Sequence, residues 1–208
     1  MRAFSNWFVP GGLALFGAVW FGGLGLAGFP GDGFAERLDL ALSSWLAANR
    51  SAQMVHAFGW ITALGNAKLV LLLALGLSIF LWRAGVRAQI APLWLVPIGA
   101  SLTTVALKLA FGRPRPDGAL RSLSDFSFPS GHATGAVAFF GFVAWLAAYN
   151  RWISPGVALF LGGVLVVLIG FSRLYLGVHY LSDVANGYLV GALWMAGGIW
   201  WIRRADSG

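Results

Sequence analysis

The sequence predicts an all-α membrane protein, a bundle of six transmembrane helices with an amphipathic helix between the first and the second. Two observations lead to this prediction. Of the 208 residues, 59% are hydrophobic and only 10% are charged, and a soluble chain of this length cannot keep that much apolar surface away from water. The charged residues also separate apolar runs of about 20 residues, the length that a helix needs to cross a bilayer.

The apolar runs place the six helices within one domain, residues 1–208. Lys68 interrupts the second run, and the part after it is too short to span, so this helix is expected to begin near Gly59. A cleaved signal peptide is the alternative for the first run, but such peptides have only about 7–15 apolar residues and a cleavage site that is missing here. The predicted helices are residues 7–28, 59–82, 89–111, 129–149, 153–171 and 180–202.

Basic residues predict the orientation. If the helices alternate in direction, most of the arginines that flank them fall on one side, which is then the cytoplasm. These residues are Arg2, Arg83, Arg87, Arg151, Arg203 and Arg204. Both termini are therefore expected in the cytoplasm, and residues 29–58, 112–128 and 172–179 at the outer face of the membrane. Because the basic residues lie singly or in pairs at helix ends, the net charge of +7 does not indicate a nucleic-acid partner.

Residues 34–50 predict a helix that lies flat on the outer membrane surface. Its apolar side chains share one helical face, and Trp45 is suited to anchor that face at the interface. Most polar residues, Asp39 among them, are expected elsewhere on the helix. A loop helix that packs on the bundle is the alternative, and the sequence does not separate the two.

The outer segments contain a set of polar residues that a purely structural bundle does not require. Polar side chains are costly at membrane depth, so their positions are informative. Three distant stretches bring cations, histidines and a carboxylate to the same membrane face, and arginine in particular matches phosphate oxygens in bidentate fashion. The residues are Lys108, Arg115, His132, Arg173, His179 and Asp183.

The stretch FPSGHATG, residues 128–135, opens the fourth predicted helix and indicates an anion site. Pro129 suits the first turn of a helix, and Gly131 lets a ligand approach the backbone closely. The free amides of that turn and the helix dipole attract a negative charge. We therefore expect this stretch to bind phosphate.

The histidines indicate phosphoryl transfer. His179 and Asp183 are four residues apart, which places them on one face of a helix, so the carboxylate can hold one imidazole nitrogen and leave the other free to attack. His132 belongs to a different helix and can protonate the leaving oxygen. A nucleophile, an acid and several cations suffice, because this chemistry depends mainly on positioning and charge stabilisation.

Other phosphatase designs have no support in the sequence. The chain has no cysteine, no Asp-x-Asp motif and only seven acidic residues, so we expect neither a thiolate nucleophile nor a metal or other cofactor. No phosphate-binding loop of the ATPase type occurs. The alternative function is a lipid or anion transporter that binds headgroups with the same cations. It leaves the pair of His179 and Asp183 unexplained.

Three motifs together resemble the signature of the type 2 phosphatidic acid phosphatase (PAP2) superfamily, in its bacterial membrane branch. They are Lys108-x6-Arg115-Pro116, Pro129-Ser130-Gly131-His132 and Ser172-Arg173-x5-His179-x3-Asp183. With Thr62-x-Leu64-Gly65, the likeness extends over residues 39–191. Vanadium haloperoxidases share the signature but are soluble, and the six apolar runs argue against that branch.

The resemblance implies a role for each residue of the signature. His179 attacks phosphorus to form a phosphohistidine, Asp183 orients it, and His132 protonates the leaving group. The implied substrate is a membrane lipid phosphate, such as phosphatidylglycerol phosphate, undecaprenyl diphosphate, phosphatidic acid or a lipid A phosphate, hydrolysed at the outer face without a metal. The residues implied to bind phosphate are Lys108, Arg115, Ser130, Gly131 and Arg173.

Other polar residues nearby are interpreted as structural. Arg113 is expected to be a solvated loop arginine, because the spacing of the motif selects Arg115. Asp125 is expected at the loop surface. Lys68 is expected to extend its long stem to the interface, with contact to a lipid headgroup as the alternative.

Overall fold

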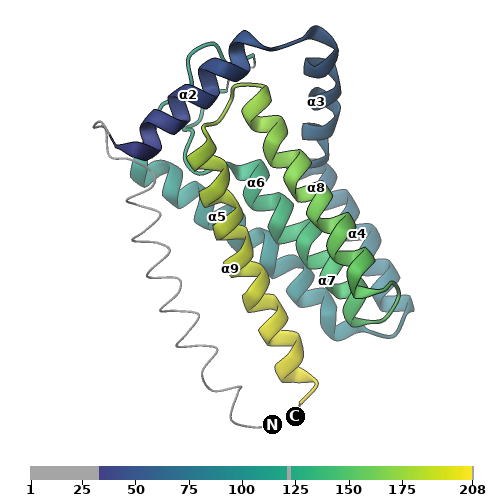
Figure 1. The fold of residues 1–208 in the computed structure, drawn as a ribbon. Coiled ribbons are helices and arrows are strands. Elements are labelled where there is room, and N and C mark those ends of the chain that lie inside the picture. Colours follow the sequence, from purple (N-terminus) through teal and green to yellow (C-terminus); the bar gives the residue numbers. More distant parts are fainter. Residues whose placement is uncertain (1–32, 121–122, 208) are drawn as a thin grey trace.

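The computed structural model describes residues 33–120 and 123–207, and within these ranges every regular element is a helix. The predicted all-α class is confirmed for this part of the chain. The first predicted helix, residues 7–28, lies outside the described residues. Figure 1 shows the axes of the bundle helices roughly aligned with one another, with α2 (Phe34–Ala48) across one end.

Two helices stand where the sequence predicted one continuous span over residues 59–82. α3 (Ala52–Leu64) and α4 (Ala67–Arg83) meet at a 46° bend. The side chain of Asn66 caps α4 by accepting a hydrogen bond of 2.9 Å from the backbone N–H of Lys68. The prediction of one straight helix is therefore wrong, and Lys68 lies in the first turn of α4.

The predicted helices over residues 89–111, 129–149, 153–171 and 180–202 agree with the structure to within about one turn at each end. Residues 131–149 form a continuous helix with a π-helical segment in its middle, a feature that is frequent near functional sites. The elements are η1 (Arg87–Gln89), α5 (Ile90–Phe111), α6 (Gly131–Gly135), η2 (Ala136–Gly141), α7 (Phe142–Tyr149), α8 (Pro155–Tyr175) and α9 (Leu181–Ala205).

Three of the described helices are long and apolar enough to cross a membrane, or four if the bent pair α3–α4 counts as one span. The three are Arg87–Phe111, Gly131–Tyr149 and Pro155–Tyr175. α9 has the necessary length, but its glycines, tryptophans and polar first turns lower its hydropathy. The count of six spans thus stays a prediction.

α9 packs closely against the helix that begins with α6, because two of its residues have no side chain. A Cβ on Gly187 would lie 2.7 Å from the backbone oxygen of Ser130, and one on Gly191 would lie 2.6 Å from that of Thr134. Small residues allow such close approach of helices in membranes. The contact sets the beginning of α6 against the beginning of α9, where the backbone N–H of Ser130 donates to the carbonyl of Asp183 at 3.0 Å.

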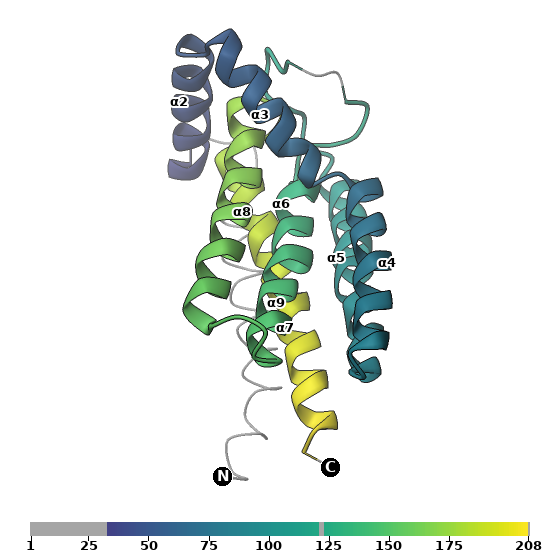
Figure 2. The same ribbon diagram turned by 90° about the vertical axis from the view of Figure 1, so that its right-hand side faces the viewer.

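α2 covers the end of the bundle at which α8 ends and α9 begins (Figures 1 and 2). Its buried residues are Leu46, which joins an apolar cluster with Phe58 and Tyr175, and Asp39. Trp45 is 59% exposed. The expectation that Asp39 lies away from the apolar face of this helix is wrong, because the carboxylate is buried with Leu46 and accepts a hydrogen bond from Ser182 at the start of α9. A place for α2 on the membrane surface stays a prediction.

Candidate active site

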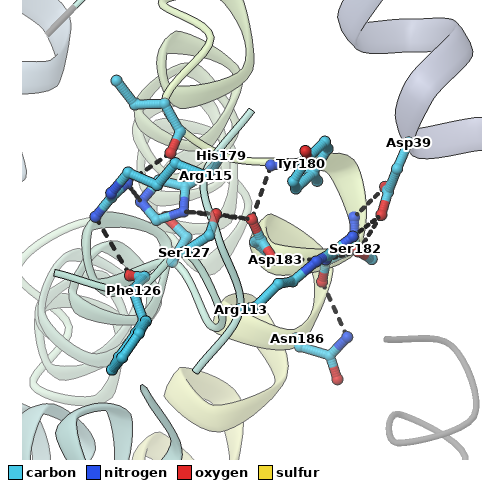
Figure 3. Close-up of polar contacts among 12 residues, drawn as sticks. Asp39, Arg113, Arg115, Phe126, Ser127, His179, Tyr180, Ser182, Asp183 and Asn186 are labelled. Carbon is cyan, nitrogen blue, oxygen red and sulfur yellow. Dashed lines mark hydrogen bonds and ion pairs between the residues drawn. The ribbon is translucent and has the colours of Figure 1, made fainter. Parts of the chain in front are cut away.

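The candidate site lies beneath α2, where the loop 112–130 and the loop 176–180 meet the first turns of α6 and α9. Figure 3 shows its polar contacts. Residues from all three sequence motifs come together here with residues that motif reasoning did not select.

Asp183 is fully buried in the first turn of α9. Its Oδ2 accepts hydrogen bonds from the backbone N–H of Tyr180 at 2.8 Å and from the hydroxyl of Ser127 at 2.5 Å. Its Oδ1 accepts from Arg113 at 2.7 Å. A buried carboxylate is costly unless it is paired and hydrogen-bonded, so these three donors both satisfy the group and fix its orientation.

His179 approaches Asp183 by a different route from the one expected. His179 precedes α9, and Tyr180 between them has an extended backbone (φ −81°, ψ 164°), so the pair does not share a helical face. The two residues meet because the Asp183 side chain turns back to cap the helix. Nδ1 of His179 lies 3.5 Å from Oδ2 of Asp183 and 3.4 Å from Oγ of Ser127.

Arg115 fixes the tautomer of His179. Its NH1 lies 3.2 Å from Nε2 of His179, and because a guanidinium can only donate, this contact requires an unprotonated Nε2. The proton of the neutral ring is then on Nδ1, which faces Ser127 and Asp183. Burial lowers the pKa of His179 to about 4, Asp183 opposes the shift, and Arg173 and Arg115 add to it. At neutral pH, Nε2 therefore carries the lone pair that a nucleophile needs.

Asp125 joins the cations of the first motif. Its Oδ1 lies 2.5 Å from NH2 of Arg115, and its Oδ2 lies 3.0 Å from Nζ of Lys108. Lys108 also donates to the carbonyl of Phe126, and Arg115 to that of Val178. Burial raises the pKa of Asp125, but the hydrogen bonds from Arg115 and Lys108 outweigh it and hold that pKa below its usual value. A carboxylate thus bridges two groups expected to bind phosphate.

Ser130 has an unsatisfied hydroxyl. It is fully buried as the N-cap of α6, yet its Oγ has no hydrogen-bond partner among the residues that the structure describes. Such groups are rare and call for an explanation, which a bound anion would supply. A Cβ on Gly131 would meet only Thr104, at an ordinary 3.7 Å, so internal packing does not demand glycine there.

The fourth predicted helix starts later than expected. It begins at Gly131, with Ser130 as its N-cap, so Pro129 lies before the helix and the expected place in its first turn is wrong.

Arg173 and His132 both contact the α3–α4 region. Arg173, in the last turn of α8, is 3% exposed and donates to Oγ1 of Thr62 at 2.7 Å. The ring of His132 lies against the bend, since a Cβ on Gly65 would come within 3.0 Å of its Cδ2. The absence of a side chain at Gly65, which lies at the break that the sequence did not predict, leaves room for His132. The Thr62-x-Leu64-Gly65 stretch thus contacts residues of both later motifs.

Arg113 is not the solvated loop arginine that the sequence suggested. It bridges Asp183 and Asp39, at 2.7 and 2.8 Å, and lies over the ring of Tyr180 at 4.3 Å. Motif spacing favoured Arg115 alone, and no local pattern connects Arg113 with a residue 74 positions away. For Ser127, the one available signal was its place close before the PSGH motif.

Comparisons with known proteins agree with these observations. The model of the PAP2 superfamily matches residues 67–207. The phosphatidylglycerophosphatase B of Bacillus subtilis is 33% identical over 165 residues, 76% of this chain and 80% of that protein. The lipid A 1-phosphatase of Rhizobium etli is 31% identical over 171 residues, 70% of each chain.

A solved structure shares the fold. The crystal structure of a transmembrane PAP2-type phosphatidylglycerolphosphate phosphatase from Bacillus subtilis superposes with a TM-score of 0.81 at 28% identity. The match covers 90% of this chain and 95% of that one. The chain belongs to the PAP2 superfamily. It is an integral membrane protein and a phosphoric ester hydrolase, a lipid phosphatase of the PAP2 type.

Proposed function

We propose that the protein hydrolyses a phosphomonoester or diphosphate of a membrane lipid through a phosphohistidine on His179. The observation that carries this proposal is the set of contacts made by the imidazole of His179. Its Nε2 contacts the cationic Arg115, and its Nδ1 faces Ser127 and Asp183. A neutral nucleophile that touches a phosphate-binding cation is held where phosphorus would arrive, and such positioning supplies much of the rate of phosphoryl transfer.

The phosphoryl oxygens would bind to groups that surround His179. Charge-assisted hydrogen bonds to phosphate are strong, and the unsatisfied hydroxyl of Ser130 supports a ligand at this place. An anion there would displace Asp125 from the cations that it bridges. The residues proposed to bind phosphate are Lys108, Arg115, Ser130, the Gly131 amide and Arg173.

The reaction proceeds in two steps. First, Nε2 of His179 forms a bond to phosphorus while the bond from phosphorus to the lipid oxygen breaks, and His132 gives that oxygen its proton. Second, water attacks phosphorus, His132 takes a proton from the water, and the bond to His179 breaks to release inorganic phosphate. Asp183 holds the ring of His179 and stabilises its positive charge in between. These residues need no metal or cofactor to balance the steps.

The proposed site faces the outside of a bacterial cytoplasmic membrane, with both termini in the cytoplasm. Lys108 and Arg173 lie in the last turns of α5 and α8, the end of the bundle that holds the site. The arginines at the end of α4 and the end of α9 lie at the opposite end. The positive-inside rule assigns that opposite end to the cytoplasm, which supports this orientation. Residues 1–208 are proposed to form a single domain.

The substrate class follows from relatives that are named for different lipid phosphates. We propose phosphatidylglycerol phosphate, undecaprenyl diphosphate or phosphatidic acid, because every contact that the proposal assigns goes to the phosphate. Phosphate release by purified protein in detergent, measured on all three lipids with and without EDTA, tests the proposal.

The controls for this assay are histidine variants. His179→Ala is expected to abolish release and the labelled phosphoenzyme, whereas His56→Ala, at an exposed position of α3, is expected to retain both. Binding of these lipids without phosphate release would contradict the proposal and favour the transporter alternative.

A further inference from the structure

A chain of buried ionic contacts connects α2 with the carboxylate that orients His179. Asp39 of α2 is 2% exposed. It accepts hydrogen bonds from Arg113 at 2.8 Å and from the backbone N–H and the hydroxyl of Ser182 at 2.9 and 2.5 Å. Arg113 in turn donates to Asp183 and to Ser182, each at 2.7 Å. Figure 3 shows this chain running from α2 to the first turn of α9.

The charged residues in this series of contacts, Asp39, Arg113 and Asp183, balance one another's charges. Two buried carboxylates, Asp39 and Asp183, share the one guanidinium of Arg113, whose side chain is only 18% exposed. The planar fork of arginine can bridge two acceptors at fixed angles, which a lysine ammonium cannot do. The ring of Tyr180 covers the guanidinium at 4.3 Å and restricts it further. The direction in which Asp183 points is therefore tied to where α2 is held.

None of the atoms in this chain belongs to the groups proposed to bind phosphate. Asp39 and Arg113 contact Asp183 and Ser182. Arg115 instead donates to Val178 and Asp125, Lys108 pairs with Asp125, and Arg173 donates to Thr62. A change in these ionic contacts should thus alter the orientation of His179 and leave the affinity for a phosphate analogue nearly unchanged.

The geometry points to Asp39 and Arg113 as positioning residues that hold Asp183, and through it His179, in the attacking orientation. This inference rests on the proposed function. It also gives α2 a role in catalysis, because this helix supplies Asp39, the first residue of the series of ionic contacts that leads to His179. Removing the partners that orient a metal-bound histidine typically costs about 10- to 100-fold in affinity or activity, and we expect an effect near the lower end of that range for this orienting role.

The test is Asp39→Asn, which keeps the shape of the side chain but removes its charge. We expect kcat and the rate of phosphoenzyme formation to fall about tenfold, with KM and the affinity for orthovanadate within about twofold of the wild type. Asp117→Asn is the matched control, since Asp117 is an exposed acid in the same loop as Arg113. It is expected to leave both rates unchanged.

Asp39 and Arg113 should also affect kcat through the same interaction. The double variant Asp39→Asn/Arg113→Gln should lose no more kcat than Arg113→Gln alone, because coupled residues are not additive. If Asp39→Asn is not recovered folded, Arg113→Lys keeps the charge without the bridging fork and should show the same split between kcat and KM.

Three outcomes decide the matter. Wild-type protein that releases no phosphate overturns the proposed function itself. Active wild-type protein with an Asp39→Asn variant of unchanged kcat overturns only the positioning role. So does a variant in which kcat, vanadate affinity and melting temperature fall together, since that is the mark of general loss of structure.

Discussion

The hydroxyl of Ser127 donates a 2.5 Å hydrogen bond to Oδ2 of Asp183, and the Oγ atom of this hydroxyl lies 3.4 Å from Nδ1 of His179. With its proton directed at the carboxylate, the hydroxyl offers a lone pair to the Nδ1–H of the ring. Ser127 thus stands between the proposed nucleophile and the residue expected to orient it (Figure 3). Asp183 acts on His179 both directly, at 3.5 Å, and through this hydroxyl.

Ser127→Ala should slow formation of the phosphoenzyme while leaving phosphate binding in place. Loss of a hydrogen bond to a charged group costs about 1.5–3 kcal/mol, and a rate falls tenfold for about 1.4 kcal/mol, so we expect kcat to drop at least tenfold. Rapid-quench measurement of the labelled intermediate checks this. Ser127→Thr retains the hydroxyl and should recover part of the rate, and an alanine variant as fast as the wild type would contradict the bridging role.

The protonation state of His179 should be visible by NMR. Because burial lowers its pKa to about 4, the ring should remain neutral, with its proton on Nδ1, as the pH falls to about 5. The chain has three histidines, so His56→Gln leaves two to assign in a ¹⁵N-histidine sample. A ring that is protonated near pH 6.5, or that carries its proton on Nε2, would contradict the proposed tautomer.

The same shift gives a pH dependence of stability. Between about pH 4 and 6.5 the unfolded chain binds a proton at His179 that the folded protein does not. The free energy of unfolding should therefore rise with pH across this window and fall as the pH is lowered through it. Comparing wild type with His179→Gln in detergent isolates this contribution, since the variant should show a smaller slope.

Asp125→Asn should tighten the binding of anions. The Asp125 carboxylate bridges Lys108 and Arg115, and an incoming phosphate has to displace it. An ion pair with an exposed partner contributes at most about 1 kcal/mol, so the affinity for orthovanadate or inorganic phosphate should rise roughly twofold to fivefold. Asp117→Asn serves as the control. Weaker binding in Asp125→Asn would mean that the carboxylate holds the cations in place instead of competing for them.

The loss of rate caused by His132→Ala should depend strongly on the leaving group of the substrate. If His132 protonates the departing oxygen, a substrate whose leaving group needs no proton, such as p-nitrophenyl phosphate, should form the phosphoenzyme at nearly the wild-type rate. Lipid substrates should lose about 100-fold or more, in the range typical of general acid catalysis. Equal losses on both kinds of substrate would assign His132 to binding instead. The phosphoenzyme should in either case break down slowly, because the same residue activates water.

Sequence reasoning found the helices and the motif residues, because both depend on local patterns. Apolar runs marked the ends of α5, α8 and α9 to within about a turn, and motif spacing selected Arg115, His179 and Asp183, which the structure brings together. What the sequence did not reveal depends on contacts over long distances in the chain. Asp39 meets Arg113 across 74 positions, and a polar residue on an amphipathic helix looks the same whether it faces water or a buried guanidinium.

The α3–α4 bend was missed for a related reason. Composition makes residues 59–82 look like a single apolar helix, and the break at Gly65 and Asn66 reflects packing against His132 and capping of the next helix. The contact between His179 and Asp183 was predicted correctly, but from a wrong structural reason. A four-residue spacing suggested one helical face, whereas the residues meet through a cap at the start of α9.

The close contact of α9 with the helix of His132 has a mechanical consequence. At Gly187 and Gly191 the two backbones touch without intervening side chains, so no rotamer change can alter their separation. The segments that carry the acid and the nucleophile should therefore tilt together when the bilayer thins or thickens, while the bend between α3 and α4 absorbs the mismatch. Turnover should then vary little with lipid chain length.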